Sequence, residues 1–316
     1  MYFDKQLGAQ ICKIKLLHVR DFLPFELYMR SLYHIFTNNN YFLAKNCSVE
    51  IINDISLLSR DTDFLFLHVS DVKHVCNIVP EKTKIIFIQS DYIINHHRDD
   101  FNAIYTYMNI NNPANTYMFE YNPLNVKFYN NNFTNLKYHY CPLTSNMYLE
   151  EAYNRNRLNI PYHQRQIDVL YLGSNNPRRD KILNQIKAKH NLVQFQFITD
   201  INQYAYYIEN SKIVVNIFSK EDNKPFDYYR LALLYSNKVL VINEKMEHID
   251  VSIDKISATM NNVMINVNYD DIPNEVDRFL TKSEQEINYI TQKAYDVFKQ
   301  FDMDHRVVDF FHLYNL

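Results

Sequence analysis

Residues 167–183, IDVLYLGSNNPRRDKIL, decide the fold. An apolar run typical of a buried strand ends at Gly173, a short polar turn follows, and Pro177 opens a helical pattern that Asn176 is placed to cap. In open α/β sheets, ligands bind beyond the carboxyl ends of strands, against helix N-termini whose free N–H groups favour anions. With Arg178 and Arg179 in the first turn, the stretch predicts an anion site. The alternative is that both arginines are solvated or paired with Asp180.

Strand–helix alternation continues on both sides of this stretch, which predicts an α/β fold with mostly parallel sheets. In the second half, strands are expected at residues 167–173, 193–198, 212–218 and 238–243, and helices at 177–189, 201–210, 227–236 and, as two or three helices, 272–316. In the first half, strands are expected at 11–18, 64–68, 84–89, 116–119 and 137–141, and helices at 24–37 and 123–131. The polar stretch 150–166 is interpreted as an interdomain linker.

Composition excludes several classes of protein. The 316-residue chain has a net charge of −3, which argues against a strongly basic nucleic-acid binder. Its two glycines, Gly8 and Gly173, exclude a Gly-rich dinucleotide fingerprint and a Walker loop. The four cysteines lack zinc-finger spacing and are interpreted as reduced thiols. No apolar run predicts a membrane span and no N-terminal pattern predicts a signal peptide, so we expect a cytoplasmic protein.

A second motif lies at residues 212–244, KIVVNIFSKEDNKPFDYYRLALLYSNKVLVINE, where two apolar runs flank a polar loop and a helical pattern. Its cations suit a diphosphate, its carboxylates could accept from a ribose, and its aromatic rings could stack on a base. The residues concerned are the cations Lys220, Lys224 and Arg230, the carboxylates Asp227 and Glu244, and the rings Tyr228 and Phe218. The alternative is that Asp227 is only a helix cap and Arg230 its surface partner.

In this order the two motifs resemble the donor domain of GT-B glycosyltransferases. The likeness is to a group with a Gly-Ser-x-Asn-Pro-Arg-Arg turn and a Glu-x-x-Arg helix, found in bacterial spore-maturation-type proteins and in large DNA viruses of amoebae. The segments FLFLHVSDV, KIIFIQSDYI, FEYNPLNVKFY and KYHYCPL follow the order of that group's acceptor domain. The likeness covers roughly residues 60 to 245, and the chain has Asp227 where the group favours Glu.

The resemblance implies two Rossmann-like domains facing across a cleft, with C-terminal helices. We expect an acceptor domain at residues 1–155, a nucleotide-sugar donor domain at 156–300, and a helix at 301–316 that packs back on the first domain. By resemblance, Gly173, Ser174, Arg178 and Arg179 line the diphosphate site, and Asp227 and Arg230 contact the nucleotide sugar. No metal or other cofactor is required, because cations and a helix end neutralise the leaving diphosphate.

A general base for the acceptor hydroxyl is expected from the first domain. Asp91 and His68, and similarly His18, stand at the ends of expected strands; each is also a candidate for a purely structural role. An enzyme that retains anomeric configuration would need no such base. Asp61-Thr62-Asp63 precedes a strand and is interpreted as a loop or strand-start feature rather than a metal motif. His96–Asp100 is interpreted as a solvated polar loop.

The sequence therefore predicts a glycosyltransferase that moves a sugar from a nucleotide-diphosphate sugar to a glycan or protein hydroxyl, without metal or nucleic acid. If the source is viral, it would act in the host cytoplasm or virus factory. The alternative is a catalytically inactive GT-B-like protein that binds a nucleotide or a glycan. The stretch Leu231–Tyr235 favours this alternative, because it lacks the acid that holds the ribose in many GT-B enzymes.

Overall fold

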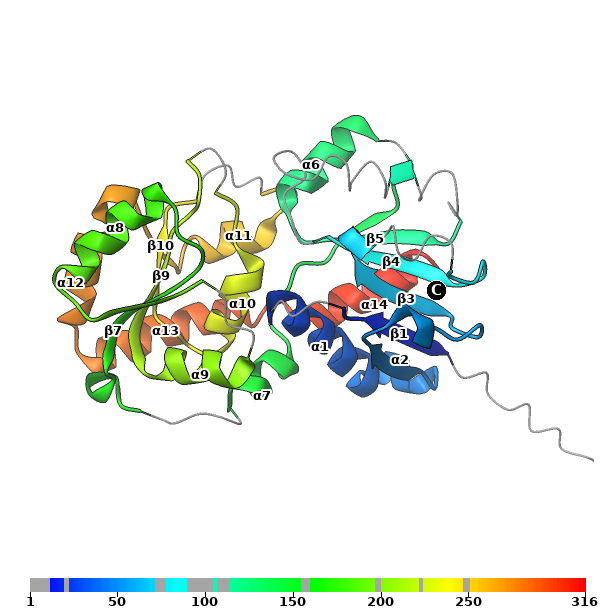
Figure 1. Cartoon of the computed structure of the whole chain (residues 1–316), viewed down its shortest axis with the longest axis horizontal. Helices are drawn as coiled ribbons and strands as arrows, with labels where there is room; N and C mark the ends of the chain where they lie inside the picture. The colour runs from blue at the N-terminus through cyan, green and yellow to red at the C-terminus, as the bar shows by residue number, and fades with distance from the viewer. Residues whose placement is uncertain are drawn as a thin grey trace, which may run out of the picture. The chain divides into compact units, whose positions relative to one another are not determined.

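The structure is a computed structural model, which describes residues 12–19, 23–71, 78–89, 105–106, 114–133, 135–154, 160–196, 200–221, 224–246 and 251–316. The chain divides into two compact units (Figure 1). The first comprises residues 1–20, 28–141 and 304–316, and the second comprises residues 21–27 and 142–303.

The first unit contains a six-stranded parallel sheet in the order β2-β1-β3-β4-β5-β6. Its strands are β1 (Lys13–Leu17), β2 (Ser48–Ile52), β3 (Phe64–His68), β4 (Lys84–Ile88), β5 (Thr116–Glu120) and β6 (Tyr138–Tyr140). Among the described residues, its helices include α1 (Leu23–Asn38), whose first residues fall in the second unit, α2 (Asn40–Ala44), α6 (Pro123–Asn132) and α14 (Met303–Leu313). Strand β2 and helix α2 lack a counterpart in the sequence prediction.

The second unit contains a five-stranded parallel sheet in the order β11-β10-β9-β7-β8. Its strands are β7 (Ile167–Leu172), β8 (Leu192–Phe195), β9 (Ser211–Asn216), β10 (Val241–Glu244) and β11 (Ile265–Val267). Its helices are α7 (Met147–Asn154), α8 (Pro177–Lys187), α9 (Ile201–Glu209), α10 (Tyr228–Ser236), α11 (Lys255–Met260), α12 (Ile272–Leu280) and α13 (Glu284–Phe298). The expected strand at 238–243 begins three residues later, at Val241.

Alternating apolar residues give the second sheet two buried faces. Val169, Ile213 and Ile242 pack in one cluster with Ile182 of α8 and Val276 of α12. Helices α8 and α12 lie side by side over that face (Figure 1). Helix α9 contacts β7 and β9 without entering this cluster, so it covers the opposite face.

The polar stretch 150–166 was predicted as a linker, and this was wrong for its first residues. Helix α7 runs through Asn154 and packs against α9 and α10 inside the second unit. Its contacts make residues 147–154 part of a folded unit, and the change of unit after Cys141 precedes the predicted boundary at 155.

Candidate functional site

The carboxyl edge of the second sheet gathers most of the predicted site residues. Gly173 follows β7, Phe218 lies two residues after β9, and Glu244 ends β10. Because β7, β9 and β10 are parallel neighbours, these strand ends meet at the same edge. The residues at these strand ends are therefore close in space, although contacting pairs are 26 to 66 positions apart in the sequence.

The turn between β7 and α8 is capped as the sequence predicts. The Asn176 side chain accepts from the N–H of Arg179 at 2.9 Å, and Pro177 occupies the first helical turn. The N–H groups of Ser174 and Asn175 make no hydrogen bond to the part of the chain that the structure describes. Exposed amides at a helix N-terminus are a general arrangement for binding phosphate oxygens.

Arg178 is held by a carboxylate of the protein itself. Its Nη1 and Nη2 donate to the two carboxylate oxygens of Glu244 at 2.8 and 2.5 Å, and its guanidinium lies 4.0 Å from the ring centre of Tyr269. Burial lowers the pKa of Arg178, but the hydrogen bonds and charge of Glu244 outweigh this effect and raise the pKa above its ordinary value. The charge of Arg178 is therefore already balanced by Glu244 within the protein.

Glu244 is fully buried and accepts from three different groups. Besides Arg178, the Nζ of Lys224 lies 3.0 Å from Oε1, and the N–H of Phe218 donates to Oε2 at 3.0 Å. Both oxygens are thus occupied by protein donors. In this arrangement Glu244 connects the end of β9, β10, α8 and Lys224, and it offers no free oxygen to a ribose.

Arg179 differs from Arg178 because its partners are neutral. Its Nε donates to the carbonyl of Ile217 at 3.0 Å, and its Nη1 donates to the carbonyl of Ser174 at 2.9 Å and to the Ser174 hydroxyl at 3.2 Å. Among the described residues, no carboxylate lies within 4.0 Å of this guanidinium, and the Arg179 residue as a whole is 7% exposed. Burial lowers the pKa of Arg179, and the positive charges of Arg230 and Arg178 lower it further.

Arg230 is positioned by a chain of buried amides. Its Nη1 donates to Oδ1 of Asn216 at 2.5 Å, Asn216 donates to Asn243 at 3.2 Å, and Asn243 donates to the Tyr235 hydroxyl at 2.8 Å. Asn216 and Asn243 are registered partners on β9 and β10. Sequence reasoning missed both, although an Asn near the carboxyl end of each of two apolar runs was the available signal.

Asp227 serves as the N-cap of α10, where its side chain accepts from the N–H of Arg230 at 3.2 Å. Its carboxylate also lies 3.5 Å from Nη1 of Arg230. The capping role was one of the two readings of Asp227 that the sequence left open. Its carboxylate, with a side chain 31% exposed, keeps access to solvent.

Gly173 is required by a close approach of two side chains. A methyl group at this position would lie 2.7 Å from the Tyr171 hydroxyl oxygen and 3.3 Å from Nη2 of Arg230. The Tyr171 hydroxyl donates to the Ser174 carbonyl, which Arg179 also contacts. Gly173 therefore lets Tyr171 and Arg230 approach the turn, and Tyr171 is a site residue that the sequence analysis missed.

Of the predicted aromatic residues, Tyr228 cannot present its ring to a nucleotide. Tyr228 is fully buried, and its hydroxyl donates to Asp254 at 2.5 Å, which leaves its ring no exposed face for a base. Lys220 is exposed on the loop after β9. Phe218 is 9% exposed, and its backbone rather than its ring meets the arginines, since its carbonyl accepts from Arg178 at 2.8 Å.

In the first unit, His68 ends β3 at the carboxyl edge and is 6% exposed. Its Nδ1 lies 2.5 Å from the Ser70 hydroxyl and accepts from the Ser70 N–H at 3.2 Å. His18, at the end of β1, is half-buried. Asp91 and the segment 96–100 lie outside the described residues.

Asp61-Thr62-Asp63 stands directly before β3. Asp61 forms an ion pair with the Lys13 side chain, and Asp63 accepts from the Lys13 N–H at 2.9 Å. These contacts fix the start of β3 beside β1, as expected for a strand-start feature.

Glu120 is a buried carboxyl group at the carboxyl end of β5 that the sequence analysis did not single out. It accepts from the Tyr129 hydroxyl at 2.6 Å, from the Asn122 N–H at 2.8 Å and from the Asn125 amide at 3.1 Å. Burial raises the pKa of Glu120 to about 8, against the lowering effect of these hydrogen bonds. A strand-terminal Glu in the quoted segment FEYNPLNVKFY was the signal that could have found it.

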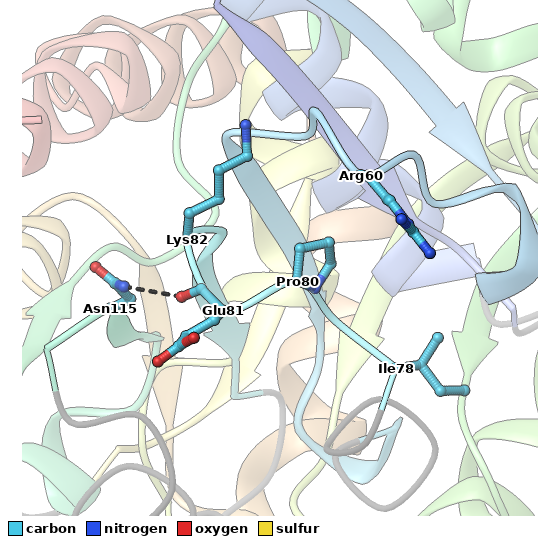
Figure 2. Close-up of a pocket in the computed structure, with 6 residues that line it drawn as sticks. All are labelled: Arg60, Ile78, Pro80, Glu81, Lys82 and Asn115. Atoms are coloured by element: carbon cyan, nitrogen blue, oxygen red, sulfur yellow. Dashed lines mark hydrogen bonds between the residues drawn. The ribbon is translucent and has the colours of Figure 1, made fainter.

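A depression of about 650 Å³ lies at the other edge of the first sheet (Figure 2). Pro80, Glu81 and Lys82 precede β4, and Asn115 precedes β5 and donates to the Glu81 carbonyl at 3.1 Å. Arg60 and Ile78 complete its lining. This pocket adjoins the amino ends of the strands, so it is separate from the carboxyl edge where His68 and Glu120 lie.

Several solved structures have a similar fold, and one of them is a complex with UDP-glucose. An alpha-glucosyltransferase in complex with UDP-glucose and DNA matches over 97% of this chain and 99% of its own, with a TM-score of 0.60 and 9% identity. Sucrose-phosphate synthase from Thermosynechococcus elongatus matches over 96% and 98%, with a TM-score of 0.56 and 10% identity. Trehalose-6-phosphate synthase matches over 92% and 86%, with a TM-score of 0.52 and 11% identity.

The chain has the GT-B fold. At 9–11% sequence identity, the likeness to these structures shows the fold alone. No protein-family model matches the chain. An uncharacterized protein of Acanthamoeba polyphaga mimivirus is 27% identical over 152 residues, which span about half of each chain, 47% in both cases. In the described part of the chain, no helix combines the length and apolarity needed to cross a bilayer.

Proposed function

We propose that this protein is a glycosyltransferase that uses a nucleotide-diphosphate sugar as donor. The second unit binds the donor, with the diphosphate against the turn after β7, and the first unit binds a glycan or protein hydroxyl acceptor. The GT-B fold of the chain and the UDP-glucose complex of a structural neighbour support this assignment. The reaction requires no metal ion, because cationic side chains and exposed amides supply the compensating charge.

The observation that carries the proposal is the environment of Arg179. The Arg179 residue is largely buried, its hydrogen bonds go to carbonyl and hydroxyl oxygens, and the charge of Arg230 adds to the local positive potential. A buried cation is costly without a compensating negative charge. A diphosphate bound beside Arg179 and Arg230 would supply that charge and would accept from the exposed amides of the turn.

This arrangement acts on the leaving group. As the bond between the sugar and the diphosphate breaks, negative charge grows on the departing phosphate oxygen. Positive groups fixed at that place before the reaction stabilise the transition state more than the ground state, which raises the rate. Asn216 fixes Arg230 by a direct hydrogen bond, and the Ser174 turn fixes Arg179.

The two neighbouring arginines then have different roles. Arg178 is saturated by Glu244 and acts as a positioning residue that holds α8 against β10. Arg179 and Arg230 are the direct phosphate ligands. Asp227 stays a candidate for the ribose or sugar hydroxyls, because its carboxylate is partly exposed beside Arg230. On the acceptor side, Asp91 and His68 remain the proposed candidates for a general base.

Thermal-shift screening of the full chain with UDP, GDP, ADP and CDP tests donor binding. A nucleotide at about 100 times its dissociation constant should stabilise the protein by ~2.7 kcal/mol. We expect Arg179→Ala and Arg230→Ala to abolish the shift. Arg278→Ala is the matched control, because Arg278 is an exposed arginine paired with Glu275 on α12, and it should keep the shift.

Asn216→Asp provides a sharper test, because it keeps the size of the side chain and adds a carboxylate against Arg230. That carboxylate would compete with the diphosphate, and we expect affinity for the nucleotide to fall by roughly 10- to 100-fold, the range for a hydrogen bond to a charged group. Release of free nucleotide from the matching nucleotide sugar then measures turnover. Binding without release would identify a non-catalytic binding protein, and an absent thermal shift with every nucleotide would refute the donor site.

A further inference from the structure

Two cysteines that are 35 positions apart in the sequence are neighbours at one end of the first sheet. Strands β1 and β2 are parallel, and their register begins with Lys13 opposite Ser48. Cys12 and Cys47 immediately precede this pair, and the N–H of Ser48 donates to the carbonyl of Cys12 at 2.7 Å. Both thiols are free, and both side chains are partly exposed.

This placement satisfies the main geometric condition for a disulfide. Adjacent strands lie about 4.7–4.9 Å apart, and the Cα atoms of a disulfide are usually about 4.4–6.8 Å apart. Side chains at registered positions of parallel strands also point to the same face of the sheet. Cys12 and Cys47 can therefore be joined with little movement of the backbone.

The chemical environment makes the two thiols unequal. Interaction with the neighbouring Cys12 thiol lowers the pKa of Cys47, and the positive charge of Lys45 lowers it further, against the effects of burial and of Asp63. Interaction with the Cys47 thiol, together with burial, raises the pKa of Cys12. Cys47 is therefore the thiol of the pair that loses its proton first.

We propose that Cys12 and Cys47 form a reversible disulfide when the protein meets a peroxide, which makes this end of the first sheet a redox-sensitive site. The Cys47 thiolate attacks hydrogen peroxide, its sulfur gains one oxygen as a sulfenic acid, and hydroxide leaves. The Cys12 sulfur then attacks the Cys47 sulfur, and the sulfenic oxygen leaves as water with the Cys12 proton. Two thiols are oxidised, one peroxide is reduced to water, and a dithiol restores the reduced pair.

The bond would link β1 to β2, which is the edge strand of the sheet. It would close the chain between residues 12 and 47, which contains α1 and α2. This site is in the first unit and involves no residue of the proposed donor site, so it is independent of the proposed function.

Peptide mapping of the full chain after treatment with hydrogen peroxide tests the proposal. Trypsin should release residues 6–13 and 46–60 as one cross-linked species, because Lys5, Lys13, Lys45 and Arg60 flank the two cysteines. We expect this species before reduction and its loss after dithiothreitol. Neither Cys12→Ser nor Cys47→Ser should yield it. Free peptides from the oxidised wild-type chain, or Cys47 found only as a sulfinic acid, would overturn the proposal.

Alkylation with iodoacetamide tests the inequality of the thiols without any substitution. In the reduced wild-type chain, Cys47 should react first and at least ~10-fold faster than Cys141, whose side chain is fully buried and whose pKa burial raises to about 11. Modification of Cys12 ahead of Cys47 would contradict the assignment of the thiolate.

Discussion

Glu244 binds the guanidinium of Arg178 with both carboxylate oxygens, at 2.8 and 2.5 Å. Both side chains are largely removed from solvent, with 1% of Glu244 and 15% of Arg178 exposed. A buried pair of this kind contributes little net stability compared with an apolar pair, but removal of one partner is costly. The pair therefore fixes the geometry of the site more than it adds to stability.

Glu244→Gln should destabilise the protein by about 3–5 kcal/mol, because it leaves Arg178 and Lys224 buried without a countercharge. Urea unfolding at pH 7 measures the difference. Glu221→Gln is the matched control, since Glu221 lies 3.9 Å from Nε of Arg178 with its side chain 83% exposed, and we expect little change. Equal effects of the two substitutions would contradict the structural role of Glu244.

Gly173→Ala should destabilise the second unit by about 1–3 kcal/mol, since the new methyl group overlaps the Tyr171 hydroxyl and crowds Arg230. It should also weaken nucleotide binding through the displacement of Arg230. In the background of Tyr171→Phe, which removes the overlapping oxygen, the same substitution should cost less. A double-mutant cycle by chemical denaturation measures this coupling, and additive effects would show that the two residues do not compete for one space.

Tyr228→Phe separates a packing role from a ligand role. The hydroxyl donates to the buried carboxylate of Asp254, which also caps α11, so its loss should destabilise the protein by about 1–3 kcal/mol. Affinity for a nucleotide should stay unchanged in isothermal titration, because the ring has no exposed face. A large loss of nucleotide affinity without a change in stability would contradict the packing role and show that Tyr228 contacts the nucleotide.

Because the pKa of the buried Glu120 is raised, we expect the stability of the first unit to depend on pH. Its pKa is raised from the ordinary value of 4.5 to about 8, so between these values the folded chain holds a proton that the unfolded chain has released. The proton on Glu120 therefore contributes to the free energy of unfolding in full below pH 4.5. This contribution is lost as the pH rises through 8, by up to about 1.4 kcal/mol per pH unit.

Unfolding by urea at pH 5, 6, 7 and 8 measures that contribution. In Glu120→Gln the side chain stays neutral, so the free energy of unfolding should not show this part of the decline with pH. The free energy of unfolding of the variant, relative to that of the wild type, should therefore rise steadily from pH 5 to pH 8. Tyr129→Phe removes a hydrogen bond that lowers the pKa of Glu120, and should extend the decline to higher pH. A difference that is constant over the four pH values would show that Glu120 does not titrate in this range.

The parts of the fold that the sequence predicted are those with local causes. The strand, the cap at Asn176 and the helix start at Pro177 depend on neighbouring residues, and the structure contains them as expected. Strand β2 was missed because its residues, SVEII, are only partly buried at the edge of the sheet and follow an Asn-rich stretch.

The candidate site could be predicted only in outline. Position after a strand placed Arg178, Arg179, Arg230 and Glu244 at one edge, but residue type could not tell which arginine Glu244 would bind. That choice depends on the register of β9 against β10 and on the depth of each side chain. The neighbouring arginines are alike in sequence and differ only in their partners.

Helix α14 follows α13 directly in the chain but belongs to the other unit. Its Phe311 ring packs against Phe36, Phe42 and Phe64, and its Phe310 ring against Phe119. Neither half is therefore encoded by one uninterrupted stretch. A recombinant fragment that ends at residue 141 would lack these phenylalanine rings of α14, which are part of the core of its own unit. A fragment meant to contain the first unit must therefore also include the last thirteen residues of the chain.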